Sequence, residues 1–203
     1  STWRYYFLMI NSLEIHPQLK NIPKEQTLCI TGHRPEKLLG EKLDLLKQAI
    51  YSRLDYKIAQ GYQYFLDGLA DGIDYIVAEY LFQLRKKNSN IKVIGVQPCD
   101  DYEEFFKFRG YHSEHLKHMK QSVDILIQLS GSYEEKDIFF NRNKFMVNHA
   151  SAVLAVCSRV RSGAMQTLSY AQKQGLAWCR LEPAPSLLYT PEPELWPAEQ
   201  KNF

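Results

Sequence analysis

Apolar residues recur along this chain in two patterns, short continuous runs and longer segments with a spacing of three or four. The short runs are typical of buried strands, and the longer spacing is typical of amphipathic helices. The predicted strands are 27–31, 64–66, 91–96, 124–129, 152–157 and 176–181. The predicted helices are 38–59, about 74–87, 113–121, 137–149 and 165–174, and we expect 98–111 to be a loop or short helices. Because strands alternate with helices, the pattern predicts a Rossmann-like, doubly wound, mainly parallel sheet with helices on both faces.

The same pattern divides the chain into three parts. Residues 1–26 form an N-terminal extension that ends in a polar, Pro-containing stretch. Residues 27–182 form the Rossmann-like domain, and 183–203 form a tail rich in Pro and Glu. We expect this tail to be mobile or to lie across the surface.

Composition narrows the function classes. The chain has 203 residues, of which 25 are Lys or Arg and 23 are Asp or Glu. This near balance argues against a dedicated nucleic-acid surface, although it leaves room for a local basic patch. No apolar run approaches the roughly 18 residues that a membrane span needs. The four cysteines are far apart and without a CxxC motif, which favours reduced thiols and a cytoplasmic location.

The most informative segment is the turn that follows the first predicted strand, Thr31-Gly32-His33-Arg34-Pro35. A strand that leads into a helix through a glycine turn presents free backbone N–H groups where the helix dipole favours an anion. Arg34 could add a bidentate contact to a phosphate or carboxylate, and His33 could contact the ligand or the backbone. The alternative is an ordinary turn in which Gly32 permits a positive φ.

Three further segments are expected at the same edge of the sheet, where doubly wound folds bind their ligands. They are the Asp67–Asp74 turn, the helix that carries Arg142 and Asn143, and the Ser162–Thr167 segment. The candidate contacts there are Gly68, Gly72, Asp74, Arg142, Asn143, Ser162, Gly163 and Thr167. Each has a structural alternative: the glycines allow tight turns, Asp71 and Asp74 cap or begin a helix, and Arg142 faces solvent.

A metal site is the weaker interpretation of the histidines. His112, His115 and His118 recur at a spacing of three on one predicted helix. A zinc site needs further ligands on the same face, and Glu114 points to another face of that helix. A solvated helix face is the preferred reading, and we predict no metal.

Taken together, these motifs resemble the YpsA-like branch of the SLOG superfamily, whose relatives include the LOG phosphoribohydrolases and DprA. The resemblance covers about 27–182 and rests on four segments. They are Thr31–Pro35, Gly68-Leu69-Ala70-Asp71-Gly72-Ile73-Asp74, Arg142–Val147, and Ser162-Gly163 with Thr167 and Tyr170-Ala171. It implies a Rossmann-like fold and a nucleotide or nucleotide-derived ligand.

The LOG enzymes use an Arg and a PGGxGTxxE motif. Arg142 matches that Arg, but Ser162 stands at the motif's Pro and Tyr170 at its catalytic Glu. Cleavage of a ribosyl–base bond needs a carboxylate, for which Asp71, Asp74 or Glu79 are the candidates.

Two functions of different classes follow. The first is a sensor or binding module for a small nucleotide derivative, with Arg34 and Arg142 on phosphate and Asp74 on ribose. The second is a nucleotide N-glycosidase, with Arg142 and either Asp71 or Asp74 in catalytic roles. Binding of nucleic acid in the manner of DprA is a third and less favoured reading. We expect no membrane partner, assign no further cofactor, and count a second copy of the chain among the expected partners.

Overall fold

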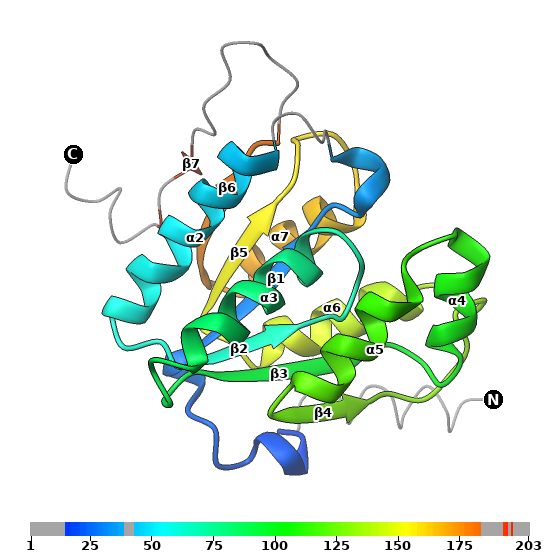
Figure 1. The fold of residues 1–203 in the computed structure, drawn as a ribbon, viewed down its shortest axis with the longest axis horizontal. Coiled ribbons are helices and arrows are strands. Elements are labelled where there is room, and N and C mark those ends of the chain that lie inside the picture. The colour runs from blue at the N-terminus through cyan, green and yellow to red at the C-terminus, as the bar shows by residue number, and fades with distance from the viewer. Residues whose placement is uncertain (1–14, 39–42, 184–192, 195, 197–203) are drawn as a thin grey trace.

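A seven-stranded sheet forms the centre of the molecule, with the strand order β4-β3-β2-β1-β5-β6-β7 (Figure 1). The computed structural model describes residues 15–38, 43–183, 193–194 and 196. The strands are β1 (Thr27–Gly32), β2 (Tyr64–Asp67), β3 (Lys92–Gln97), β4 (Ile125–Gln128), β5 (Ala152–Val156), β6 (Ala177–Leu181) and β7 (Pro193–Glu194). β1 to β6 run parallel, and only the two-residue β7 is antiparallel to its neighbour. The prediction of a doubly wound, mainly parallel sheet is confirmed.

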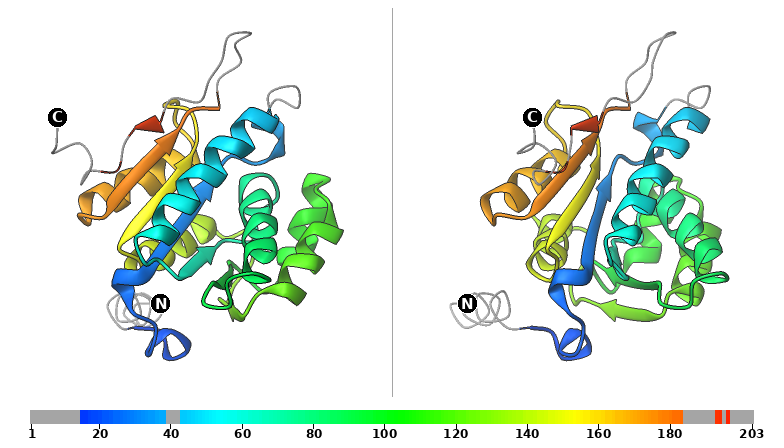
Figure 2. Two further views of the ribbon diagram at one scale, coloured as in Figure 1. Left: turned by 60° about the vertical axis from the view of Figure 1, so that its left-hand side comes forward. Right: turned by 90° about the vertical axis from the view of Figure 1, so that its left-hand side faces the viewer.

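Helices cover both faces of the sheet, as Figure 2 shows. They are α2 (Leu43–Ala59), α3 (Ile73–Arg85), α4 (Tyr102–Arg109), α5 (Ser113–Ser122), α6 (Ile138–Asn148) and α7 (Gly163–Lys173), with short 3-10 turns at Pro17–Leu19, Lys24–Gln26 and Pro35–Lys37. The helices α2 to α5 lie on one side, and α6 and α7 lie on the other (Figure 2). None of the helices in the described part of the chain is long and apolar enough to cross a membrane.

Two hydrophobic cores result from the alternation of side chains along the strands. In β1, Leu28 and Ile30 join the core under α2 and α3, whereas Cys29 joins the core under α6 and α7. All three side chains are fully buried. A strand that is buried on both faces reads as a continuous apolar run, which is why these strands were recognisable in the sequence.

The segment after β1 differs from the prediction. A helix is expected over 38–59, but Pro35–Lys37 forms a 3-10 turn, Leu38 is extended (φ −107°, ψ 135°), and α2 is described from Leu43. The Leu38 N–H closes the turn on the Pro35 carbonyl, after which the backbone leaves helical geometry. The prediction that a helix begins at Leu38 is therefore wrong, and the Thr31–Pro35 turn does not lead directly into an α-helix.

Two described pieces of the tail pack on the domain. β7 pairs with β6, where Arg180 lies opposite Glu194. Trp196 is fully buried in the core on the α2 side, and its ring lies 4.2 Å from the Lys57 Nζ. These contacts cover the β6 edge of the sheet, which would otherwise expose unpaired backbone groups.

Candidate functional site

A cavity of about 470 Å³ opens at the carboxyl ends of β1 and β5. The strand order reverses here, because the chain builds β2, β3 and β4 on one side of β1 and then β5 and β6 on the other. Ligands of open α/β sheets bind at such a switch point. The walls comprise residues 30–34, 36, 37, 70, 74, 109, 137, 139, 140, 142, 143, 162–164 and 166.

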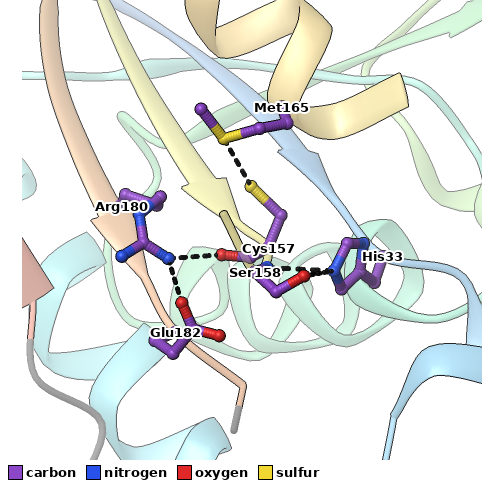
Figure 3. Close-up of polar contacts among 6 residues, drawn as sticks. All are labelled: His33, Cys157, Ser158, Met165, Arg180 and Glu182. Carbon is purple, nitrogen blue, oxygen red and sulfur yellow. Dashed lines mark hydrogen bonds and ion pairs between the residues drawn. The ribbon is translucent and has the colours of Figure 1, made fainter. Parts of the chain in front are cut away.

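His33 ties the turn after β1 to the turn after β5. Its Nε2 accepts a hydrogen bond from the Ser158 backbone N–H at 3.0 Å, as Figure 3 shows. An Nε2 that accepts this bond carries no proton, so the ring is neutral with its proton on Nδ1. Burial of the ring also lowers the pKa of His33. Its main-chain N–H bonds to Val156 and its carbonyl accepts from Ile73, so this wall residue joins three elements.

Gly32 serves a different purpose from the one that its turn position suggests. A Cβ at Gly32 would lie 2.5 Å from the Ile73 Cβ, and the residue does not have a positive φ. Glycine is therefore required because the start of α3 packs directly on the end of β1.

Arg34 lies against two neighbouring aromatic rings. Its guanidinium carbon lies 4.9 Å from the centre of the Phe105 ring and 4.8 Å from that of Phe139. Cation–π contacts of this kind attract a guanidinium to the rings and help to hold it in place. Within the described ranges, no hydrogen bond or ion pair engages the Arg34 side chain. Its N–H edge is thus available to a molecule in the cavity.

The turn between β2 and α3 is held by its own polar groups and by groups of the neighbouring helices. The Asp67 Oδ1 accepts from the Leu69 N–H at 2.8 Å, and the Leu69 carbonyl accepts from the Tyr102 hydroxyl at 3.1 Å. These bonds hold Leu69 at φ 59°, a conformation that non-glycine residues rarely adopt. Gly72 has φ 89°, and a Cβ there would lie 2.6 Å from the His33 carbonyl oxygen. The turn is a preformed scaffold.

Asp71 faces away from the cavity. Its carboxylate accepts from the N–H groups of Gly72 and His112, and it lies 2.9 Å from the His115 Nδ1. The His115 ring stacks on Tyr75 at 3.8 Å. Asp71 therefore connects the start of α3 to the start of α5.

The other histidine of α5, His118, also has an acidic partner. His118 pairs with Glu79 at 2.6 Å, across the α3–α5 contact. Among the described residues, no group of three or more His, Cys, Asp or Glu side chains is arranged to hold a metal ion. Glu79, a candidate carboxylate from the sequence, faces α5 through this pair and is not part of the cavity wall.

Arg142 crosses beneath the floor of the cavity from α6. Its side chain is buried, with 3% exposed, and its Nη1 donates to the carbonyl oxygens of Gly68 and, at 3.3 Å, Val96. The Arg142 Nε donates to the Asn143 Oδ1 at 2.7 Å. A Cβ at Gly68 would lie 2.7 Å from the Arg142 guanidinium carbon and 2.9 Å from the Asp74 Oδ2. Gly68 is therefore the residue that allows a cation and a carboxylate to approach the same turn.

Asp74 and Asp67 place two carboxyl groups near this guanidinium. Burial raises the pKa of Asp74 to about 6, while Arg142 and the N–H groups of Ala70 and Gly68 oppose the rise. Burial and the neighbouring Asp74 also raise the pKa of Asp67 well above its ordinary value. The Asp67 Oδ2 is buried and has no hydrogen-bond partner in the described structure. Two neighbouring buried carboxyl groups do not both ionise readily, and the raised pKa of Asp74 brings its change of charge closer to neutral pH.

The start of α7 contributes backbone rather than side chains. Ser162 caps the helix, because its Oγ accepts from the Met165 N–H at 3.1 Å. Gly163 has open space around the position of a Cβ, and the first turn contains no acidic residue. Thr167 is buried one turn further on, where its hydroxyl donates to the Gly163 carbonyl at 2.8 Å. Ser162 and Gly163 line the cavity and Thr167 supports them.

A buried arginine fixes the neighbouring strand ends. Arg180 of β6 donates to the Cys157 carbonyl at 2.8 Å and pairs with Glu182 (Figure 3). The side chain of Cys157 contacts α7 instead, because its Sγ lies 4.0 Å from the Met165 Sδ (Figure 3). These contacts anchor the chain on either side of the 158–162 loop.

The structure brings together most of the residues that the sequence singled out. Those that line the cavity are Thr31, Gly32, His33, Arg34, Asp74, Arg142, Asn143, Ser162 and Gly163. Those that lie behind its walls are Gly68, Asp71, Gly72 and Thr167. Sequence reasoning missed Glu36, Lys37, Arg109, Asp137, Phe139, Phe140 and Gln166. The sequence could have suggested Phe139 and Phe140 as cavity residues, since they lie in the first turn of the helix that carries Arg142. No sequence pattern indicates that Arg109 of α4 reaches the cavity.

The chain is similar to one protein family and to a protein of Bacillus cereus. The YpsA family model, described as the YspA SLOG family, matches residues 28–176. A UPF0398 protein of Bacillus cereus (strain G9842) is 23% identical over 158 residues, which are 74% of this chain and 84% of that protein.

Two solved structures match the chain, and the first is similar in fold. The DNA processing protein A (DprA) of Streptococcus pneumoniae matches with a TM-score of 0.57 at 19% identity. The match covers 81% of this chain and 52% of DprA, so the chain spans about half the length of that relative. The Moco carrier protein of Chlamydomonas rheinhardtii matches with a TM-score of 0.45 at 15% identity, over 76% of this chain and 74% of that one.

Proposed function

The chain is a member of the YspA SLOG family, and we propose that it binds a nucleotide or nucleotide-derived small molecule in the cavity, as a sensor or binding module. The observation that carries the proposal is the meeting of two anion-binding features across one cavity. One is the uncovered start of α7 at Gly163, and the other is the free N–H edge of Arg34.

The start of α7 suits a phosphate. The Ser162 Oγ and carbonyl accept from Met165 and Gln166, which leaves the N–H groups of Gly163 and Ala164 without intrahelical partners. The helix dipole favours an anion there. Because Gly163 has no side chain, a phosphate oxygen can approach the backbone closely.

The charges of the cavity walls also favour an anion. Four cationic and three acidic side chains line it: Arg34, Lys37, Arg109 and Arg142 against Glu36, Asp74 and Asp137. Arg109 and Glu36 form an ion pair at 2.7 Å, so they offset each other. Arg34, Lys37 and Arg142 then stand against Asp74 and Asp137, which leaves the walls with one positive charge in excess. Arg34 and Lys37 lie on the β1 side, while Arg142 and Asn143 orient the floor. Asp74 is available to accept from ribose hydroxyls.

The first test is thermal unfolding with AMP, ADP, ADP-ribose and NAD. A ligand at about 100 times its dissociation constant stabilises the folded protein by roughly 2.7 kcal/mol. We expect stabilisation by at least one phosphate-bearing compound and no effect of its free nucleoside. Arg34→Gln should abolish the shift, whereas Lys173→Gln, at the far end of α7, should not. No shift with any compound would contradict the proposal.

A second candidate function is hydrolysis of the ribosyl–base bond. The observation that favours it is the carboxyl group of Asp74, which lines the cavity beside Arg142 and has a pKa near 6. A group that titrates near neutral pH suits general acid or base catalysis. Free base and ribose phosphate should then accumulate with the wild type, and Asp74→Asn should bind without turnover. An intact ligand after prolonged incubation would leave the binding module as the function.

Nucleic acid is a less suitable ligand. The formal net charge is only +2, whereas nucleic-acid surfaces carry clusters of Lys and Arg along a stripe. The likeness to DprA is one of fold at 19% identity, so we do not extend DNA binding to this chain.

A further inference from the structure

A row of aromatic rings leads from the cavity to the surface of α4. It consists of Phe139, Phe105, Tyr133 and Phe108, and we call it the aromatic row. Phe139 lines the cavity, and its ring centre lies 4.7 Å from that of Phe105. The next steps, from Phe105 to Tyr133 and from Tyr133 to Phe108, are 5.7 and 6.0 Å. The row therefore connects the wall of the cavity to solvent without a break.

Phe108, at the outer end of the row, is not part of the buried face of α4. Tyr102, Phe105 and Phe106 form the buried face of that helix, and Phe108 is 74% exposed. A single exposed apolar residue is unremarkable in itself. Phe108 differs because its ring lies at only 26° to the ring of Tyr133 and is thereby part of an ordered stack.

A polar boundary, formed by the ion pair of Arg109 and Glu36, runs beside the row at Phe105. Arg109 lines the cavity, pairs with Glu36 at 2.7 Å, and lies 6.0 Å from the Phe105 ring. The Tyr111 hydroxyl donates to the same Glu36 carboxylate at 2.9 Å. A ligand that crosses this boundary would pass from the anion-binding cavity, over an arginine, to an exposed aromatic face. An anion-binding cavity followed by an exposed aromatic face suits a molecule with a phosphate linker and an aromatic ring beyond it.

We propose that the aromatic row extends the ligand site, and that the ligand is of the dinucleotide class, with a second aromatic ring that stacks on Phe108 beside Tyr133. The proposal rests on the proposed function, because the phosphate-bearing part occupies the cavity. Flat aromatic rings stack on exposed Phe or Tyr side chains with little dependence on the identity of the base. Phe108 is thus a residue that sets specificity for the length of the ligand.

The test compares two probes that differ in the second ring and in the positive charge that this ring carries. NAD carries a nicotinamide that ADP-ribose lacks, and both have the same adenosine and diphosphate. We expect the wild type to bind NAD about tenfold more tightly than ADP-ribose, measured by calorimetry, since a stacked ring is commonly worth a factor of that order. In Phe108→Ala the ratio should fall to about one, while the affinity for ADP-ribose should not change.

Two further variants separate stacking from apolar contact. Phe108→Leu keeps an apolar side chain and should also lose the preference for NAD, whereas Phe108→Trp should retain it. Because Phe108 is exposed, all three variants should melt at the wild-type temperature.

The outcomes distinguish this inference from the proposed function. Equal affinities for NAD and ADP-ribose in the wild type, with binding still lost in Arg34→Gln, would overturn the second-ring site and leave the nucleotide cavity in place. A preference for NAD that survives Phe108→Ala would overturn it as well. If neither probe binds and no compound of the thermal panel does, the proposed function fails, and this inference fails with it.

Discussion

The turns after β2 and β5 lie at the same edge of the sheet, yet they are built in opposite ways. In the turn after β2, residues 65–74 are buried, and the polar groups of Asp67, Leu69 and Asp71 bond mainly within the turn or to the helices above it. In the turn after β5, Arg159, Val160 and Arg161 are exposed, and so is Gly163 at the start of α7. The first turn is a scaffold with fixed electrostatics, and the second presents open backbone.

This difference between the two turns explains why Gly68 and Gly163 have different roles. A Cβ at Gly68 would overlap Arg142 and Asp74, whereas a Cβ at Gly163 would meet nothing within 4 Å. Gly68 is needed by the folded protein, and Gly163 is needed, on the proposed function, by the ligand. Substitutions in the first turn should therefore alter stability, and substitutions in the second should alter binding.

The largest effect is expected from Arg142→Ala. The variant leaves the carbonyl oxygens of Gly68 and Val96 without their donor and removes the cation beside two buried carboxyl groups. Loss of one member of such a buried set costs about 3 to 5 kcal/mol. Urea unfolding should show this loss. Lys144→Ala on the same helix is the control and should cost about 0.5 kcal/mol or less, and equal losses in both would refute a special role for Arg142.

The pH dependence of stability should follow from Asp67 and Asp74. Both carboxyl groups have raised pKa values, so the folded state holds protons more tightly than the unfolded state. Their contribution is favourable at about pH 4 and is lost as pH rises, and Asp74 alone, whose pKa is raised from 3.8 to about 6, accounts for about 3 kcal/mol of this loss. The variant with both Asp67→Asn and Asp74→Asn keeps the acceptors for Leu69 and Ala70 and should not show this decline. Parallel stability curves for the variant and the wild type would contradict the assignment.

Gly68→Ala should have the next largest effect. The added methyl group meets the Arg142 guanidinium and the Asp74 carboxylate at less than 3.0 Å, so one of them must move. Overpacking of this kind costs about 2 kcal/mol, which chemical unfolding can measure. The melting temperature should fall, and any ligand affinity should fall with it, since Asp74 and Arg142 are displaced.

Gly163→Ala is the matched substitution in the open turn and should have the smallest effect on stability. The methyl group enters open space, and alanine is a better helix former than glycine. We expect a change of about 0.5 kcal/mol or less. A loss as large as that of Gly68→Ala would remove the distinction between the two turns.

The sequence was informative wherever one local signal had a unique structural meaning. Mainly apolar runs located β1 to β6, because strands covered on both faces carry few polar residues. Because the carboxyl ends of parallel strands share one edge of the sheet, Arg34, Asp74, Arg142 and Gly163 could be expected to lie close together before any contact was known.

What the sequence could not supply was the direction of individual side chains. Asp71 and Asp74 lie three residues apart at the start of α3, yet one faces α5 and the other faces the cavity. Arg109 reaches the cavity from α4, whose position depends on the packing of Tyr102 and Phe106 in the core. The helix predicted to begin at Leu38 does not begin there, because Leu38 is extended after a 3-10 turn, which has no hydrophobic period of its own.

The measurement that tests the central claim most directly is calorimetric binding of ADP-ribose to the wild type and to Gly163→Val. A Cβ at Gly163 meets nothing within 4 Å, so the valine side chain enters open space over the start of α7. The account predicts an unchanged melting temperature for the unliganded variant and a loss of affinity of about tenfold or more. Equal affinity in the two proteins would contradict a phosphate site at the start of α7.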